Sequence, residues 1–258
     1  MASRIHELLL GKGLDEMKIS IITITYNSEK TIEETIKSVI DQDYQDVEYI
    51  IVDGQSKDCT LQIIEKYSNH ISTLISEPDR GICDAFNKGI ANATGEVIGI
   101  INSDDMLLPG AISHLVSVIK PETEILYGHG RRLFNDGHTE PYLAGDYRKL
   151  THQMTLVHPA TFIRRTAYDK YGLFDLKYKG CMDRELLLRM YKSGAVFQKD
   201  DFEYAIYRMG GFSDVQFKNV ISREREEISI KYGQNPLLVK MHSVLINAKY
   251  WVKKTIRG

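Results

Sequence analysis

The sequence has few of the features that would set the protein apart from ordinary globular domains. It contains three cysteines in 258 residues, at positions 59, 83 and 181, and none forms a CxxC pair. A disulfide framework and a zinc site are therefore both disfavoured, and a reducing compartment is the simpler expectation. No apolar run reaches the roughly 18 residues that a membrane-spanning helix needs.

An excess of charge of one sign is also absent. The chain carries 33 Lys and Arg against 35 Asp and Glu, a formal net charge of −2. This balance argues against nucleic acid as a partner. With 43% hydrophobic and 26% charged residues, the composition is ordinary for a soluble globular protein, and the length suits one large domain or two small ones.

The first 16 residues lack the pattern of a signal peptide. Leu8-Leu9-Leu10 is a short apolar patch, and no small-residue cleavage site follows it. Met17-Lys18 has the look of a natural start. We therefore expect residues 1–16 to be a leader or a segment added for expression, and the protein to be cytoplasmic.

The N-terminal half alternates buried strands with amphipathic helices. Residues 18–25 and 47–52 are dense in β-branched side chains, which is typical of buried strands. The apolar residues at 32–40 fall on one helical face, and Asn27 or Ser28 is expected to cap that helix. This alternation predicts parallel βαβ units.

Polar residues follow three of the expected strands at the point where each strand ends. They are Thr25, Tyr26 and Asn27, then Asp53, and then Asn102-Ser103-Asp104-Asp105. Ligands bind beyond the carboxyl ends of strands in such sheets, so these residues are expected to meet in one crevice. None of these turns reads GxGxxG or GxxxxGK[ST], so a dinucleotide fingerprint and a P-loop are both absent.

Asp104 and Asp105 are adjacent carboxylates at the end of the apolar run 97–101. Without compensation they would repel each other and lose hydration. Mg²⁺ or Mn²⁺ relieves both costs, because these cations prefer carboxylate oxygens and share the rest of their shell with water and phosphate. The pair predicts a metal site that holds a diphosphate. The alternative is an Asp-rich turn that caps the next element.

Arg80 and Lys88 are the cations expected to lie nearest that diphosphate. An Arg side chain forks onto phosphate oxygens, and a Lys side chain acts as a point charge. The alternative for each is a solvated surface cation.

Seven short motifs resemble those of the family 2 glycosyltransferases, and they stand in that family's order. They are ITITYN at 22–27, VDGQSKDCT at 52–60, EPDRG at 77–81, NKG at 87–89, TGE at 94–96, NSDD at 102–105 and LPG at 108–110. The resemblance covers residues 18–210. It implies the GT-A fold, an α/β fold in which helices flank a mixed, mostly parallel, Rossmann-like sheet.

The resemblance also implies how the chain is divided. The GT-A domain would span residues 17–215. Its nucleotide-sugar-binding half would be 17–110 and its acceptor and catalytic half 111–215. A C-terminal helical extension would follow at 216–258.

The resemblance assigns donor-binding roles to residues in the first half. The first strand end (Thr25, Tyr26 and Asn27) and Asp53 would hold the nucleoside, with Asp53 accepting a hydrogen bond from the base N3–H. Asp79 and Arg80 would lie near the base or the phosphates.

The family's Asp-x-Asp motif corresponds to Asn102-Ser103-Asp104, so asparagine replaces the first carboxylate. Asp104 then falls on the metal-ligand position, and Asp105 would help directly or through water.

In the second half, Asp183 falls on the general-base position of the family, at the start of a helical pattern. A base at this place takes the proton of an acceptor hydroxyl as that hydroxyl attacks the anomeric carbon, and the attack inverts the sugar centre. Glu185 is the second candidate for the base. The alternative for Asp183 is an N-cap. His158 would touch the leaving diphosphate or the acceptor, or else is a structural histidine.

Two further segments have competing interpretations. Residues 208–213 resemble the segment that covers the nucleotide in relatives, or form a plain turn around Gly210-Gly211. Residues 237–257 follow a basic amphipathic helical pattern with Trp251 and no acidic residue. This pattern suits an anionic membrane surface, and the alternative is a helix docked on the domain or on a second subunit of a homo-oligomer.

The prediction is a metal-dependent inverting glycosyltransferase. The donor would be a UDP- or GDP-linked sugar, and the acceptor a glycan or lipid-linked hydroxyl in cell-surface polysaccharide synthesis, at the inner face of the membrane. One alternative is a sugar-nucleotide-binding scaffold subunit, which only Asn102 favours. A sugar nucleotidyltransferase fits less well, because residues 25–29 are not the Gly-rich basic loop of that class.

Overall fold

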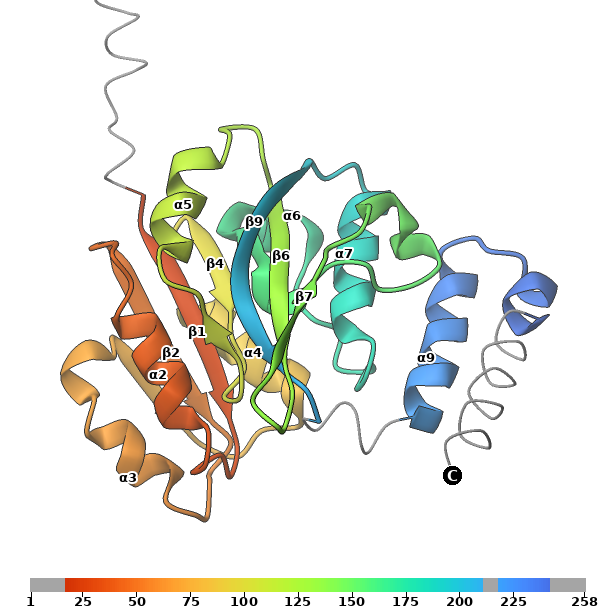
Figure 1. Ribbon diagram of the computed structural model, residues 1–258. Helices are drawn as coiled ribbons and strands as arrows, with labels where there is room; N and C mark the ends of the chain where they lie inside the picture. The colour runs from red at the N-terminus through yellow and green to blue at the C-terminus, as the bar shows by residue number, and fades with distance from the viewer. Residues whose placement is uncertain (1–16, 211–217, 242–258) are drawn as a thin grey trace, which may run out of the picture.

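One mixed β-sheet runs through the described part of the chain (Figure 1). The computed structural model describes residues 17–210 and 218–241, so the expected leader at 1–16 lies outside it. Within these residues the sheet has nine strands. Eight of them lie in the order β3-β2-β1-β4-β8-β6-β9-β5, and β7 pairs with β6.

The strands and helices have the following bounds. The strands are β1 (Ile19–Thr25), β2 (Val47–Asp53), β3 (Thr73–Ser76), β4 (Val97–Ile100), β5 (Met106–Leu107), β6 (Ile125–Leu133), β7 (Thr139–Tyr142), β8 (Thr161–Arg164) and β9 (Phe197–Arg208). The α-helices are α2 (Ile32–Ile40), α3 (Thr60–Glu65), α4 (Ile82–Asn92), α5 (Ala111–Val118), α6 (Arg165–Tyr171), α7 (Met182–Lys192) and α9 (Lys218–Lys231). Short 3-10 turns are η2 (Ser68–His70), η3 (Tyr147–Thr151) and η4 (His158–Ala160).

The N-terminal half of the sheet is parallel, as predicted. β1 lies between β2 and β4, and its last residue, Thr25, is in register with Asp53 at the end of β2. Helix α4 packs on β1 and β2 at close range. A Cβ atom at Gly89 would lie 2.4 Å from Ile22 Cγ2, so the missing side chain lets the helix approach the strand.

The C-terminal half mixes strand directions. β8 is antiparallel to both β4 and β6, while β9 is parallel to β6 and antiparallel to β5. β6 and β7 form an antiparallel hairpin. β9 begins at Phe197 and ends at Arg208.

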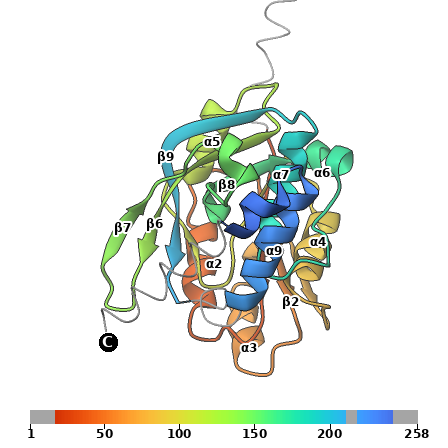
Figure 2. The same cartoon turned by 90° about the vertical axis from the view of Figure 1, so that its right-hand side faces the viewer.

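Helix α9, from Lys218 to Lys231, is the first helix of the expected C-terminal extension. Figures 1 and 2 both place it beside α7. A short helical turn follows at 236–241. The rest of the expected tail, residues 242–258, lies outside the described residues.

The expected cap of the first helix is wrong. α2 begins at Ile32 and its N-cap residue is Thr31. The Asn27 side chain instead accepts a hydrogen bond from the Lys57 backbone, and the Ser28 hydroxyl pairs with Ser103 Oγ at 2.8 Å. These partners are distant in sequence, so the local pattern did not reveal them.

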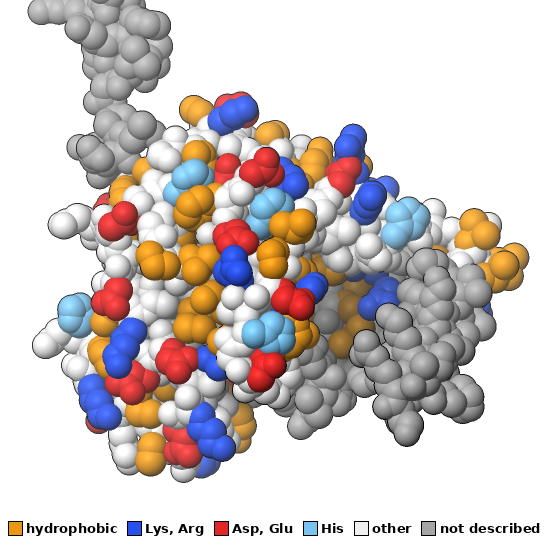
Figure 3. Space-filling model, in the orientation of Figure 1, with side chains coloured by type: hydrophobic (Ala, Val, Ile, Leu, Met, Phe, Trp, Pro, Cys, Tyr) orange, Lys and Arg blue, Asp and Glu red, His pale blue; other side chains and the backbone are white. Residues whose placement is uncertain are grey.

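The surface agrees with the charge balance of the sequence. On the face that Figure 3 shows, Lys and Arg side chains are interspersed with Asp and Glu side chains. That face shows no broad field of one sign of the kind that nucleic-acid binding uses.

Glu48 ties the start of β2 to β1 and to the loop before β4. Its carboxylate accepts hydrogen bonds from Ser20 Oγ at 2.6 Å, Thr94 N at 2.7 Å and Thr94 Oγ1 at 2.6 Å, and it pairs with Lys18 Nζ at 3.0 Å. Burial raises the pKa of Glu48, but these hydrogen bonds more than offset it and lower the pKa from 4.5 to about 2. The folded protein therefore favours the charged form.

We expect Glu48→Gln to lower the free energy of unfolding by about 2 kcal/mol near pH 7. A pKa that is lower in the folded state stabilises the protein above about pH 5, and this contribution is lost as the pH falls toward about 2. The gap between wild type and variant should therefore shrink on acidification. Urea denaturation across this range checks it, with Glu96→Gln as the exposed control. A gap that stays constant with pH would contradict the prediction.

Candidate active site

The ends of three neighbouring strands form one edge of the sheet. β2, β1 and β4 are adjacent and parallel, so Thr25, Asp53 and the turn at 102–105 end at the same edge. The hydrogen bond between Ser28 and Ser103 joins the loops after β1 and β4. The backbone N–H of Asn27 donates to Ser56 Oγ at 2.8 Å and joins the loops after β1 and β2. The structure thus brings the predicted donor-site residues together.

Asp53 is fully buried and organises its own loop. Its carboxylate accepts from the Ser56 backbone at 3.1 Å, from Ser56 Oγ at 2.5 Å and from Ser76 Oγ at 2.8 Å. Ser56 N also lies 3.3 Å from Asp53 Oδ1, so contacts within the fold already fill the about four lone-pair positions of this carboxylate. The predicted contact from Asp53 to a base N3–H stays a prediction.

Tyr26 and Asp79 meet at Gly54. A Cβ atom at Gly54 would lie 2.5 Å from Asp79 Oδ2 and 3.4 Å from the Tyr26 ring. The Tyr26 ring is 60% exposed, and Asp79 accepts from the Gly81 backbone at 2.8 Å. This corner therefore offers an exposed aromatic face beside a carboxylate, which suits stacking and hydrogen bonding of a base.

Arg80 and Lys88 are both paired with acids of their own segment. Arg80 Nη2 lies 2.8 Å from Asp84 Oδ1, and Lys88 Nζ lies 2.9 Å from Glu77 Oε1. Lys88 Nζ also lies 3.6 Å from Asp84 Oδ2, and the spacing of four residues from Arg80 to Asp84 and from Asp84 to Lys88 is the sequence signal for these two pairs. In this structure the two cations hold the 77–88 segment, and their predicted contact with a diphosphate remains a prediction.

Asp105 is a fully buried carboxylate at the end of the β4 turn. It accepts from the Arg208 backbone at 3.1 Å and from Asn102 Nδ2 at 3.2 Å. Burial, followed by the charge of Asp104, raises the pKa of Asp105 well above its ordinary value. Asn102 Oδ1 is buried and has no hydrogen-bond partner among the described residues.

These residues suit a divalent cation whose remaining ligands come from the substrate. The buried carboxylate of Asp105, the neighbouring half-buried Asp104 and the amide oxygen of Asn102 are a set of oxygen ligands such as Mg²⁺ and Mn²⁺ prefer. Across residues 17–210 and 218–241, no three His, Cys, Asp or Glu side chains gather to hold a metal alone. Mg²⁺ sites that use one or two carboxylates and substrate phosphates need no third protein acid.

Arg208 is a site residue that the sequence analysis did not single out. Its Nε donates to the Asp104 carbonyl at 3.2 Å, and its guanidinium pairs with Glu34 on α2. The end of β9 is thus fixed to the β4 turn. Residues 211–213, the remainder of the predicted covering segment, lie outside the described residues.

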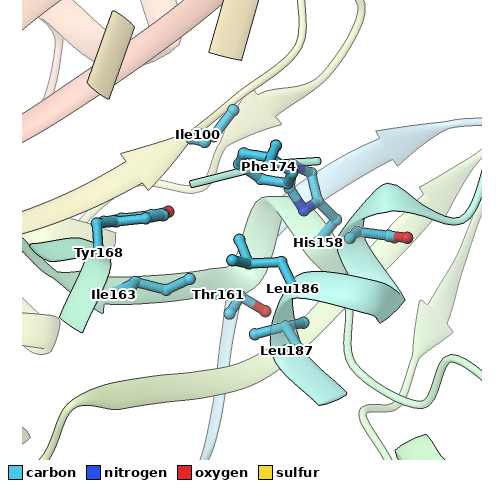
Figure 4. A pocket seen from close by; sticks show the side chains of 9 residues that line it. Ile100, His158, Thr161, Ile163, Tyr168, Phe174, Leu186 and Leu187 are labelled. Atoms are coloured by element: carbon cyan, nitrogen blue, oxygen red, sulfur yellow. The ribbon is translucent and has the colours of Figure 1, made fainter. Parts of the chain in front are cut away.

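On the other side of the site, His158 and Asp183 line one small pocket with largely apolar walls (Figure 4). The walls are Ile100, Thr161, Ile163, Tyr168, Phe174, Leu186 and Leu187. His158 Nε2 is buried without a hydrogen-bond partner among the described residues. Burial lowers the pKa of His158, and the nearby Asp183 charge opposes this shift only in part. The imidazole is therefore favoured as the neutral form.

Asp183 is the second residue of α7, and Cys181 occupies the N-cap position. The N-cap alternative for Asp183 is therefore wrong. The side chain is half-buried and accepts from the Arg184 backbone at 2.6 Å. Ile100, the last residue of β4, lines the same pocket, so the pocket reaches the strand that leads to the turn at 102–105.

Glu185, the second candidate for the base, is in a different environment. It is 1% exposed, and its carboxylate binds Arg189 at 3.0 Å, Lys231 at 2.8 Å and Tyr232 OH at 2.6 Å. These contacts join α7 to the segment at the end of α9. A carboxylate held in this way has no access to an acceptor hydroxyl, so the structure argues against Glu185 as the base.

Comparison with known sequences decides the family. The profile described as Glycosyl transferase family 2 matches residues 20–182. The chain belongs to this family. A glycosyltransferase of Mycobacterium tuberculosis is 30% identical over 177 residues, which cover 66% of this chain and 68% of the relative. The Escherichia coli glucosyltransferase WfgD, named for UDP-Glc and a GlcNAc-diphosphoundecaprenol, is 28% identical over 145 residues, 55% of this chain and 56% of the relative.

Solved structures share the fold of this glycosyltransferase. Staphylococcus aureus TarS in complex with UDP-GlcNAc has a TM-score of 0.68 at 21% identity, with 86% of this chain and 69% of TarS covered. The mannosyltransferase PcManGT of Pyrobaculum calidifontis, in complex with GDP-Man and Mn²⁺, has a TM-score of 0.66 at 16% identity, with 88% and 68% covered. The predicted GT-A fold is thus confirmed.

Proposed function

We propose that this family 2 glycosyltransferase transfers a sugar, with inversion, from a UDP- or GDP-linked donor to a hydroxyl of a glycan or lipid-linked acceptor. One observation carries the proposal. Asp183, on α7, lines a pocket together with Ile100, the last residue of β4, and the carboxylates Asp104 and Asp105 stand on the turn that follows that strand. Inverting transfer needs two such separate acidic centres.

Asp183 is the general base in this proposal. The acceptor oxygen bonds to the anomeric carbon on the face opposite the diphosphate, and its proton passes to Asp183. The bond from the anomeric carbon to the diphosphate oxygen breaks, and its electron pair leaves with the nucleoside diphosphate. The neutral His158 and the apolar wall limit water near Asp183, which preserves its contact with the acceptor.

Asp104 and Asp105 are the proposed metal ligands. Asp104 would bind the cation directly, and Asp105 would bind it directly or through water. The Asn102 side chain, with its amide oxygen, lies beside Asp105. When bound, Mn²⁺ or Mg²⁺ supplies charge stabilisation to the departing diphosphate. Ser103 and the strand ends at Thr25-Tyr26-Asn27 and Asp53 hold the donor beside it, and Arg80 and Lys88 are the cations for its phosphates.

The relatives support the donor class and suggest the acceptor class. TarS and PcManGT were crystallised with UDP-GlcNAc and with GDP-Man, and the name of WfgD specifies a diphosphoundecaprenol acceptor. By analogy, the acceptor here is a glycan or lipid-linked sugar of cell-surface polysaccharide synthesis. The domain limits 17–215 and 216–258 belong to the same proposal.

The first prediction of this proposal concerns the metal. A nucleotide at about 100 times its Kd should stabilise the folded enzyme by about 2.7 kcal/mol. In a thermal-shift screen of UDP, GDP and their sugars, we expect a shift that requires Mn²⁺ or Mg²⁺ and is lost in Asp104→Asn. Asp169→Asn, on the exposed face of α6, is the control. A shift equal with and without metal would argue against a metal requirement, and no shift with any nucleotide would contradict the proposed donor class.

The second prediction concerns the base. Asp183→Asn should retain donor affinity but lose turnover by about 10²–10⁴-fold, because the amide cannot accept the acceptor proton. Release of the nucleoside diphosphate measures turnover with the donor identified by thermal shift. Asp169→Asn again serves as the matched control. Turnover of Asp183→Asn at the wild-type rate would show that another group is the base.

The third prediction concerns contact with a membrane surface. Among the described residues no helix is long and apolar enough to cross a bilayer. Leu237, Leu238 and Met241 are exposed on the turn at 236–241, ahead of the Lys-rich residues 242–257. An apolar face with basic neighbours binds anionic lipid at the interface.

Vesicles that contain phosphatidylglycerol should therefore cosediment the protein, and binding should weaken as salt is raised. The double variant Leu237→Ser, Leu238→Ser should bind less. Leu143→Ser, a single exposed leucine next to β7, is the control. Equal binding by the double variant and wild type would favour docking of the tail on protein.

A further inference from the structure

Glu224 on α9 reaches the segment that leads into the α7 helix. Its Oε1 accepts from the Lys179 backbone N–H at 2.7 Å, and its Oε2 accepts from Gly180 N–H and Cys181 N–H, each at 2.9 Å. The Glu224 side chain is buried. One carboxylate thus binds three successive backbone donors, and Asp183 follows two residues after the last of them.

This contact lies at the start of a helix that has no local side-chain cap. The N-cap residue of α7, Cys181, makes no side-chain capping hydrogen bond. Glu224 accepts from the N–H of Cys181 and from the two N–H groups before it, so it binds the segment that enters the helix. The helix dipole favours a negative charge at this end, and Glu224 supplies it from a helix more than 40 residues away in sequence.

The segment also approaches α9 closely. A Cβ atom at Gly180 would lie 2.6 Å from Ile221 Cγ1. Cys181 Sγ lies 3.6 Å from the Ile221 carbonyl. The position of residues 180–181 is therefore set by α9.

The residue after Asp183 is held by the same helix. Arg184 is 1% exposed, and its guanidinium donates to the Arg225 carbonyl at 3.2 Å and to Ser229 Oγ at 2.9 Å, both on α9. It also donates to the carbonyls of Leu150 and Thr151. Asp183 thus lies between Cys181 and Arg184, both of which contact α9, and its side chain accepts a hydrogen bond from the adjacent Arg184 backbone.

We propose that Glu224 is a positioning residue for Asp183, and that α9 completes the active site by fixing the first turn of α7. The family profile ends at Met182, so this contribution comes from the chain beyond the matched region. The inference rests on the proposed role of Asp183 as the base. A purely stabilising role for Glu224 is the competing explanation, and the two differ in what they do to turnover.

The test compares two glutamates of α9. Glu224→Gln removes the carboxylate that binds the three N–H groups. Glu227→Gln makes the same chemical change one helical turn later, where the carboxylate contacts the Lys177 and Tyr178 side chains of the same segment. Ile228→Val, in the core beneath α9, controls for a general loss of stability.

We expect Glu224→Gln to lower kcat by about 10- to 100-fold, since a displacement of about 1 Å at a reacting group costs up to 10²-fold. Its donor Kd should stay within about twofold of wild type. Glu227→Gln and Ile228→Val should keep the wild-type kcat. UDP-GlcNAc, UDP-Glc and GDP-Man with Mn²⁺ are the donors, and nucleoside diphosphate release is the signal.

A double-mutant cycle separates the explanations. If Glu224 acts through Asp183, Glu224→Gln should cause no further loss in the Asp183→Asn background. A kcat for Glu224→Gln equal to that of Glu227→Gln, a loss confined to donor affinity, or an equal loss in both backgrounds would each overturn the proposal. Wild-type turnover by Asp183→Asn would instead refute the base assignment.

Two measurements keep the test decisive. If Glu224→Gln does not fold, Gly180→Ala displaces the same segment from Ile221 without changing charge, and it should show the same loss of kcat. Amide hydrogen exchange at residues 179–184 should be faster in Glu224→Gln than in Glu227→Gln, whether or not a donor is turned over. Equal exchange in the two variants would overturn the proposal independently of the enzyme assay.

Discussion

The buried Asp105 connects three elements of this fold at the site. Its carbonyl accepts from Thr35 Oγ1 on α2 at 2.7 Å, and its carboxylate accepts from Asn102 and from the Arg208 backbone at the end of β9. Helix α2, the turn after β4 and strand β9 therefore meet at this one residue. Because burial and Asp104 both disfavour its charge, the site gains from a cation, and structure and proposed chemistry depend on the same residue.

The two halves of the site are stabilised differently. The donor side rests on parallel strand ends and on loops that hydrogen-bond each other, as Asn27 with Ser56 and Lys57. The proposed acceptor side is built on α7, whose N-terminus has no side-chain capping hydrogen bond. The buried charged side chains of Glu224, Arg184 and Glu185 connect this helix to α9 and to the residue that follows it. Buried charges are costly unless paired, so each has several partners.

Much of the donor side could be predicted from sequence. β-branched runs located β1 and β2, and the polar residues at their ends were correctly expected to converge, because parallel strands end at the same edge. Predictions of side-chain contacts from the local sequence pattern were wrong where a side chain had more than one available partner. Asn27 and Ser28 do not cap α2, because their side chains bond to Lys57 and Ser103 instead.

The sequence by itself determined the family, the order of strands and helices, and the positions of Asp53, Asp104 and Asp183, since motif order and periodicity are properties of short segments. Only the tertiary structure decided that the Glu185 carboxylate is bound by Tyr232, that the Arg208 backbone bonds to Asp105 in the turn after β4, and that Glu224 binds the backbone N–H groups just before α7. These contacts join residues 43 to 103 positions apart, and no local pattern specifies which buried charge meets which backbone group.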